Sequence, residues 1–141
     1  MKEYFEANVK YERQGEKGMM QRVNERFIVD CLSFADAEKR VLEEVGCYAT
    51  GSVNIQDIKR VQYMEIFETT DEGADKFYKV KISIVTIDED KGVEKLTPAF
   101  ILVEAANIQD ALERMKEGMK DYLVDFELVS IHDTKIMDVY K

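Results

Sequence analysis

The second half of this 141-residue chain repeats the first half. Residues 33–43 return as residues 107–117, and four of them meet identical residues: Asp36, Ala37, Arg40 and Glu43. Farther along, residues 64–67 return as residues 137–140 with the same order of apolar and acidic side chains. Self-similarity at a nearly constant spacing indicates one supersecondary unit built twice. Any fold of this chain therefore has to accommodate two copies of one small set of elements.

Alternating apolar and polar residues predict a hairpin at the start of each repeat. In the first repeat, every second residue is apolar from Phe5 to Tyr11, and a second strand is expected over residues 21–32. In the second repeat, residues 77–84 alternate in the same way, and the acidic segment 88–92 predicts a tight hairpin loop. Pro98 cannot donate to a strand ladder, so it indicates a sheet edge or the start of a strand.

A capped helix is predicted after each hairpin. Ser33 and Asn107 stand where an N-cap is expected, each followed three residues later by an aspartate. Gly46 is expected to end the first helix. The spacing of apolar residues predicts two buried stripes: Phe34, Ala37, Val41 and Val45 in the first helix, and Ile108, Ala111, Met115, Met119 and Tyr122 in the second.

These elements predict an α+β fold made by internal duplication of a ββαβ(β) unit. The repeats cover about residues 3–68 and 76–141, joined by a short acidic connector around Gly73. A repeat of about 65 residues has little apolar surface to bury alone. We therefore expect one pseudo-twofold domain over residues 1–141, mainly antiparallel, with both helices packed on one face. An exposed sheet edge would also allow a homodimer.

The net charge of −9 restricts the partners of the protein. It opposes binding to nucleic acids and anionic membranes, whose phosphates attract basic proteins, and it favours a basic protein partner. The start of the chain has no apolar segment of a signal peptide, and the longest apolar run, residues 99–103, is too short to span a bilayer. A cytoplasmic location is expected, with Cys31 and Cys47 as reduced core thiols.

The usual signatures of catalysis and of metal or cofactor binding are missing from the sequence. His132 is the single histidine and has no orienting partner at a suitable spacing, so we interpret it as a surface residue. Asp88, Asp90 and Gly92 resemble part of a calcium loop, but Ala99 stands where the closing glutamate should be. No phosphate-binding loop, nucleophile elbow or zinc-ligand spacing is present. A non-enzyme without cofactor or metal is therefore predicted.

Basic side chains on the outward faces of the two hairpins form the candidate binding site: Lys10, Arg22 and Arg26 in the first repeat, and Lys79, Lys81 and Lys95 in the second. Grouped on one repeated face, they could bind a nucleotide, a nucleic-acid strand or an acidic protein surface. The alternative is that they pair across strands with glutamates, namely Glu6, Glu12, Glu25 and Glu94.

Several stretches resemble an uncharacterised family of small acidic proteins from gut Bacteroidetes and their phages. They are residues 26–38, 77–81, 86–95 and 125–131, and the ending Ile-Met-Asp-Val-Tyr at 136–140 is the most specific of them. The family is a domain of unknown function, so the resemblance implies no site residues. It implies a phage or mobile-element origin and a bacterial cytoplasm.

The leading hypothesis is a non-catalytic binding protein that acts on a host or phage protein, because strong acidity favours a basic partner. The first alternative is a nucleotide or small-anion binder that sequesters a signal molecule through the basic residues. The second alternative is an accessory protein for single-stranded nucleic acid, which the net charge disfavours.

Overall fold

The computed structural model describes residues 3–141, which fold into two compact units. Unit 1 comprises the described residues through Gln62 together with Lys135–Lys141, and unit 2 comprises Tyr63–Thr134. Each unit contains one helix and one four-stranded mixed sheet with the same β-β-α-β order. The predicted α+β fold with an internal duplication is confirmed.

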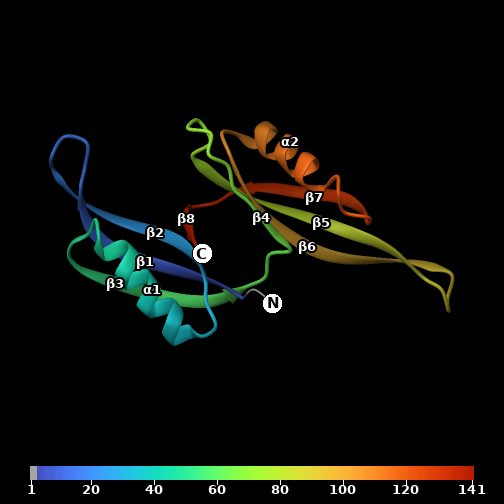
Figure 1. Cartoon of the computed structure of the whole chain (residues 1–141), viewed down its shortest axis with the longest axis horizontal. Coiled ribbons are helices and arrows are strands. Elements are labelled where there is room, and N and C mark those ends of the chain that lie inside the picture. Colours follow the sequence, from blue (N-terminus) through green and yellow to red (C-terminus); the bar gives the residue numbers. More distant parts are fainter. Residues whose placement is uncertain (1–2) are drawn as a thin grey trace. The chain divides into compact units, whose positions relative to one another are not determined.

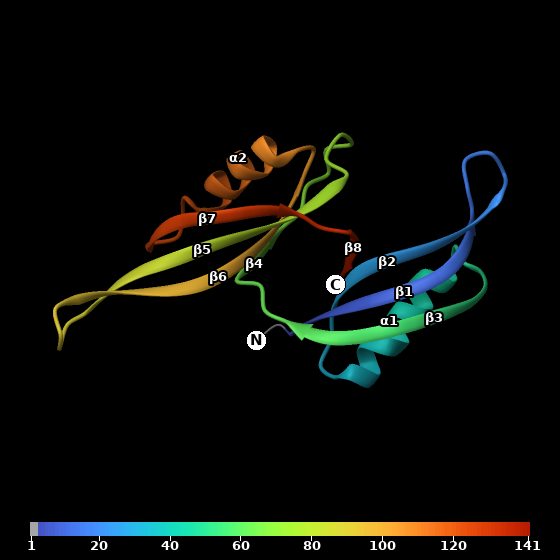
Figure 2. The ribbon, with the colours of Figure 1, turned by 180° about the vertical axis from the view of Figure 1, so that it is seen from behind.

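Unit 1 is a sheet with the strand order β3-β1-β2-β8, covered on one face by α1 (Figure 1). Its elements are β1 (Tyr4–Gln14), β2 (Met20–Asp30), α1 (Phe34–Gly46), β3 (Thr50–Val61) and β8 (Ile136–Tyr140). Alternate residues of the hairpin face the helix, and they form a buried core with it: Ala7, Val9, Tyr11, Phe27, Val29, Val41 and Val45. Seen from behind, the sheet lies in front of its helix (Figure 2).

Unit 2 repeats this arrangement with the strand order β4-β6-β5-β7 and α2 over one face. Its elements are β4 (Glu65–Phe67), β5 (Lys76–Asp88), β6 (Val93–Ala105), α2 (Ile108–Met119) and β7 (Asp125–Asp133). The core between sheet and helix is apolar apart from the Tyr78 hydroxyl: Tyr78, Val80, Ile82, Ile101, Val103, Ala105, Ala111, Met115 and Met119.

The two repeats exchange their last short strand. β4 comes from the first repeat but pairs in parallel with β6 of unit 2, and β8 comes from the second repeat but pairs in parallel with β2 of unit 1. A strand parallel to β2 would also run parallel to β3, because both are antiparallel to β1. Only residues 62–64 link β3 to β4, and a parallel return needs a crossover of about a dozen residues. The short link therefore excludes β4 from its own sheet.

Both helices begin at the predicted caps. The Ser33 hydroxyl accepts a hydrogen bond from the Asp36 amide at 3.1 Å, and the Asn107 side chain accepts one from the Asp110 amide at 2.8 Å. Tyr122 lies beyond the end of α2 and is only partly buried, so it does not belong to the buried stripe of the second helix. The other predicted residues are buried except for Phe34 and Ile108, which are about half exposed. Each is the first helical residue, and its side chain points back beyond the helix end.

Pro98 lies within β6 opposite Ser83, at the sheet edge that its chemistry predicts. β4 pairs only with Ile101–Val103, so β6 has no described neighbour on that side at Pro98. The sheet therefore loses no hydrogen bond through the missing amide proton of Pro98.

Strand register shows which residues of the two copies correspond. The offset that relates residues 33–43 to residues 107–117 also aligns Glu25 with Ala99. Glu25 stands opposite Val9, and Ala99 stands opposite Ile82. Two residues farther along the first strand, Tyr11 therefore corresponds to Ile84. Through the same alignment, Phe5 corresponds to Tyr78 and Tyr140 to Phe67.

Candidate functional site: an aromatic and acidic cavity in unit 1

The most chemically distinctive place in the molecule is a cavity of about 530 Å³ in unit 1, which we name the tyrosine cavity. It lies where the end of α1, the exchanged strand β8 and the β1–β2 hairpin meet. Its wall combines aromatic, acidic and sulfur-containing side chains: Tyr11, Arg13, Glu25, Phe27, Glu44, Cys47, Tyr48, Met137, Asp138 and Tyr140.

A buried carboxylate forms the inner wall of this cavity. Glu25 lies on the face of β2 that is turned toward the helix and is only 6% exposed. The Tyr11 hydroxyl donates a hydrogen bond to its Oε1. The second oxygen, Oε2, lies 3.7 Å from the Arg13 guanidinium, which is beyond hydrogen-bond distance. Glu25 thus faces the cavity with one oxygen satisfied and one loosely paired.

Aromatic rings form another part of the wall. The Tyr48 and Tyr140 hydroxyls lie 2.9 Å apart and share a hydrogen bond. The Tyr140 ring stacks on Phe27 with centroids 5.4 Å apart, and Tyr48 meets Tyr11 edge to face at 5.8 Å. These contacts hold the three tyrosines in a fixed frame, because each ring has both a ring contact and a hydroxyl contact.

The environment raises the pKa of all three phenols above the ordinary value. Burial, reinforced by the neighbouring Glu25 carboxylate, raises the pKa of Tyr11 far above its ordinary value of 10.0. Burial and the hydrogen bond with Tyr48 raise the pKa of Tyr140 in the same way, and burial also raises the pKa of Tyr48. The tyrosines therefore act as hydrogen-bond donors and as aromatic surfaces.

Charges around the cavity favour a cation inside it. Its wall carries three carboxylates, those of Glu25, Glu44 and Asp138, and one guanidinium, that of Arg13. Arg40, from outside the wall, pairs with Glu44 at 3.0 Å. Counting Arg40, three negative charges face two positive ones, so the local balance is negative.

In unit 1, Tyr11, Glu25 and Tyr140 form a layer between the helix and the hairpin. In unit 2, the residues at the equivalent positions are apolar. Ile84 and Ala99 occupy the positions of Tyr11 and Glu25, and both pack against the apolar core of unit 2. Phe67 takes the place of Tyr140 and packs over Gly118 in α2, where a Cβ would lie 2.6 Å from its ring. The fold itself therefore does not require the tyrosines and the buried carboxylate of unit 1.

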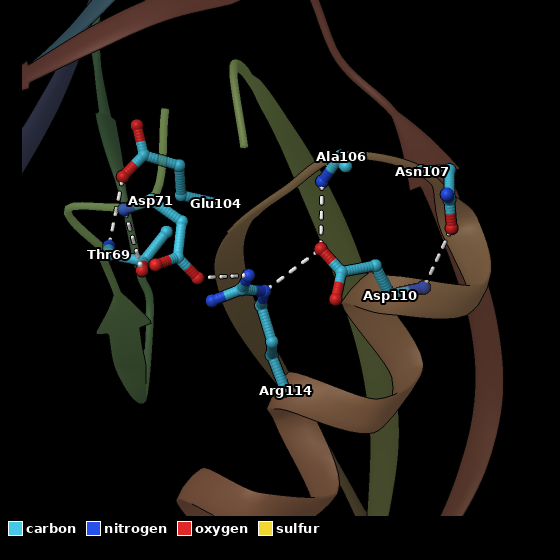
Figure 3. A network of polar contacts seen from close by, with 7 residues as sticks. All are labelled: Thr69, Asp71, Glu104, Ala106, Asn107, Asp110 and Arg114. Carbon is cyan, nitrogen blue, oxygen red and sulfur yellow. Dashed lines mark hydrogen bonds and ion pairs between the residues drawn. The ribbon is translucent and has the colours of Figure 1, made fainter. Parts of the chain in front are cut away.

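Unit 2 has a different polar feature beside its helix, an acidic hollow of about 490 Å³ next to Phe67 and Arg114. Arg114 donates to Asp110 at 2.9 Å and to Asp71 at 2.7 Å, and Asp110 also accepts from the Ala106 amide (Figure 3). These donors lower the pKa of Asp110. The Glu104 carboxylate accepts from the Thr69 amide at 3.0 Å. The contact between Arg114 and Asp71 fastens the segment after β4 to α2.

The predicted basic residues of the first repeat share the face of the sheet opposite α1. Arg26 pairs with Glu6 at 3.1 Å, and Arg22 pairs with Glu12 at 3.5 Å. Glu6, which is mostly buried, also pairs with Lys59. Lys10 and Arg22 together line a polar cavity of about 470 Å³ with the hydroxyl groups of Thr50 and Ser52.

The predicted basic residues of the second repeat are divided between the two faces. Lys79 and Lys81 lie on the face opposite α2, with their ammonium groups 4.5 and 6.0 Å from the Phe100 ring centroid. Strand alternation places Lys95, which stands opposite Thr86, on the other face. The structure therefore does not bring all three lysines together.

The tyrosine cavity was not among the sites predicted from the sequence. The sequence did contain one signal for it. Glu25 lies between Val23 and Phe27 on the inward face of its strand, where an apolar residue is expected. The cysteines also differ from expectation, since both are free thiols but Cys47 is exposed at the cavity wall. His132 is exposed on β7, as expected.

Within residues 3–141, no group of three or more histidine, cysteine, aspartate or glutamate side chains is arranged to hold a metal ion. No described helix has the length and apolar character needed to cross a membrane.

The fold and the site define a class of protein, a duplicated α+β chain with exchanged short strands and one aromatic, acidic cavity. The chain belongs to the family described as "Domain of unknown function (DUF4494)", whose sequence profile matches residues 3–141. No curated protein matches the chain.

Proposed function

We propose that this is a non-catalytic binding protein that uses the tyrosine cavity to hold a side chain of a partner protein. The observation that carries the proposal is the difference between the two copies. Unit 2 fills the layer under its helix with Ile84 and Ala99, whereas unit 1 places Tyr11 and the buried Glu25 there.

The physical argument is the cost of the buried carboxylate. Moving a charged group out of water costs several kcal/mol, and a single partner rarely recovers that cost. Glu25 keeps one oxygen without a close donor. An apolar pair at the equivalent positions packs without this penalty in unit 2. The buried carboxylate is therefore not explained by stability. A ligand that donates a hydrogen bond to Glu25 would explain why unit 1 keeps it.

Binding fits the chemistry of this site better than proton transfer. A general base or nucleophile needs a pKa near the working pH. The pKa values of Tyr11 and Tyr140 are instead raised well above 10.0, mainly by burial. Both phenols stay neutral at pH 7 and are suited to donate hydrogen bonds and present ring faces.

The resemblance to proteins of gut Bacteroidetes and their phages supports the setting that we propose. The partner is then a host or phage protein in the bacterial cytoplasm. The net charge of −9 adds long-range attraction for a basic partner.

A comparative pull-down tests the proposal. The wild-type chain and the double variant Tyr11→Ile/Glu25→Ala, which copies the layer of unit 2, serve as baits in host lysate. We expect a protein that the wild-type chain retains and the double variant loses. Retention of the same proteins by both baits would contradict a role for the cavity.

A second candidate function is the binding of a nucleotide or small anion next to β3. The supporting observation is the polar cavity that brings Lys10 and Arg22 together with Thr50 and Ser52. Glu12 already pairs with Arg22, so a ligand would have to compete for that guanidinium. A thermal-shift screen over a nucleotide panel tests this candidate, because a ligand at 100 times its Kd adds about 2.7 kcal/mol of stability.

A further inference from the structure

We infer that the tyrosine cavity binds the guanidinium group of an arginine side chain on the partner. The inference rests on the proposed function and names the chemistry that the cavity selects. It depends on the wall of the cavity, on the loosely paired oxygen of Glu25 and on the position of Arg13.

The wall offers the two kinds of group that a flat cation needs. Aromatic faces attract cations through the ring quadrupole, and tyrosine is among the better rings for this contact. Tyr48 and Tyr140 are partly exposed at the cavity, and their shared hydrogen bond of 2.9 Å fixes their orientation. A planar guanidinium can stack on such a ring while its edge stays free to donate hydrogen bonds.

Glu25 supplies the anchoring charge. Its side chain is more than nine-tenths buried, and Oε1 already accepts from Tyr11. Glu25 lines the cavity, and its Oε2 lies 3.7 Å from the Arg13 guanidinium. An incoming guanidinium that approaches to hydrogen-bond distance would form the stronger, charge-assisted contact that Arg13 does not make.

Asp138 extends the acidic wall on β8. One of its oxygens accepts from the Val139 amide at 2.8 Å, and the carboxylate remains at the cavity. Glu44 is held by Arg40 at 3.0 Å, so we assign it no direct role. Arg13 is the cation at the wall, and it both shields Glu25 and repels a second cation. Removal of Arg13 should therefore strengthen the binding of a cation, whereas removal of the Glu25 charge should weaken it.

The probes for the test are three short peptides with the sequence acetyl-Gly-X-Gly-amide, in which X is arginine, lysine or citrulline. Citrulline keeps the shape of arginine and removes its charge. Binding to the full chain is followed by NMR of labelled tyrosine rings, with the signals assigned from single Tyr→Phe variants. We expect the arginine peptide to shift the signals of Tyr11, Tyr48 and Tyr140 and to leave that of Tyr78 in unit 2 unchanged.

The expected order of affinity is arginine over lysine over citrulline, with citrulline weaker by about tenfold or more. Glu25→Gln should weaken arginine binding by about tenfold, and Arg13→Ala should tighten it by about threefold, because the competing cation is gone. Equal binding of citrulline, tighter binding of lysine, or weaker binding to Arg13→Ala would each overturn the inference.

The double variant Tyr11→Ile/Glu25→Ala keeps the test independent of folding. The same pair of residue types already packs in unit 2, and an unchanged signal of the buried Tyr4, which lies on β1 outside the cavity, reports an intact unit 1. We expect no binding of the arginine peptide to it. If the pull-down partner is lost from the double variant but retained fully by Glu25→Gln, the guanidinium inference fails while the proposed protein-binding function stands.

Discussion

Unit 1 and unit 2 share their order of elements, their helix caps and their exchanged parallel strand, but they differ in the layer between helix and hairpin. Unit 2 fills this layer with Ile84, Ala99 and Phe67, which pack against its core. Unit 1 places Tyr11, Glu25 and Tyr140 at the same positions and leaves a cavity beside them. Within one molecule, unit 2 thus serves as the control for what the fold needs.

The difference shows how a duplication separates stability from function. Once two copies exist, one copy can keep an apolar layer while the other carries polar groups that cost stability. If the chemistry of this layer, rather than the fold around it, distinguishes the two units, substitutions in the layer should affect the two units differently.

The largest effect is expected when a carboxylate is placed in unit 2. Ala99→Glu inserts a charge next to Ile84, which has no phenol hydroxyl such as Tyr11 supplies in unit 1, and we expect a loss of about 2–3 kcal/mol in the free energy of unfolding. Adding Ile84→Tyr should recover about 1–2 kcal/mol by supplying the missing donor. Denaturant unfolding measures both. Lys95→Glu, at an exposed position of the same strand and face, is the control, and a loss as large as that of Ala99→Glu would contradict the argument.

Removal of the hydroxyl in unit 1 should come next. Tyr11→Phe leaves both oxygens of the buried Glu25 without a close donor, so we expect a loss of about 2 kcal/mol. Tyr78→Phe makes the same change in the core of unit 2, where unit 1 has Phe5, and should cost less than about 0.5 kcal/mol. Similar losses for the two variants would mean that the Tyr11 hydroxyl has no special role.

Two helix glycines should respond with opposite signs. A Cβ at Gly118 would lie 2.6 Å from the Phe67 ring, whereas a Cβ at Gly46 meets no atom within 4 Å. Alanine in a helix gains up to about 1 kcal/mol over glycine, and overpacking costs about 1–3 kcal/mol. Gly46→Ala should therefore stabilise the protein slightly, and Gly118→Ala should destabilise it by about 1 kcal/mol. In a Phe67→Ala background, the Gly118→Ala change should become stabilising.

Alkaline pH should destabilise unit 1 through its tyrosines. The pKa values of Tyr11 and Tyr140 are raised in the folded state, so their contribution to stability is complete below pH 10. Above pH 10 the unfolded chain releases protons that the folded chain retains, and stability falls by at most about 1.4 kcal/mol per pH unit for Tyr11. Unfolding at pH 8 to 11 checks the slope. The Tyr11→Phe variant should show a shallower fall, and an unchanged slope would exclude Tyr11 as its source.

Much of the fold was predictable because its signals are local. The repeat, the alternation of residues 5–11 and the caps at Ser33 and Asn107 depend on neighbours in the sequence, and the structure confirms them. The exchanged strands could not be read from such patterns. β4 and β8 are short, and their partners follow from the length of a link rather than from their own residues.

The candidate site was hidden for a related reason. Tyr48 and Tyr140 are 92 residues apart in sequence, and Tyr11 and Glu25 meet only through the register of a hairpin. The basic residues were visible as charges, but Arg22 and Arg26 prove to be paired with glutamates across the strands. Such pairing depends on which residues stand opposite, and residue type alone does not reveal it.

The smallest effect concerns a contact that the two units share. Arg114 and its counterpart Arg40 each reach the segment that follows the exchanged strand, since Arg114 donates to Asp71 after β4 and Arg40 donates to the Lys141 carbonyl after β8. Both arginines lie near the surface, where ion pairs add little to global stability. Arg114→Gln should therefore leave the unfolding midpoint nearly unchanged but speed amide exchange at Asp71 and Ala74. Arg40→Gln should leave those two amides unchanged, because its contacts lie in unit 1. Faster exchange throughout unit 2 in Arg114→Gln would show that the contact supports the whole unit, and the two units would then differ in their helix anchors as well as in their inner layer.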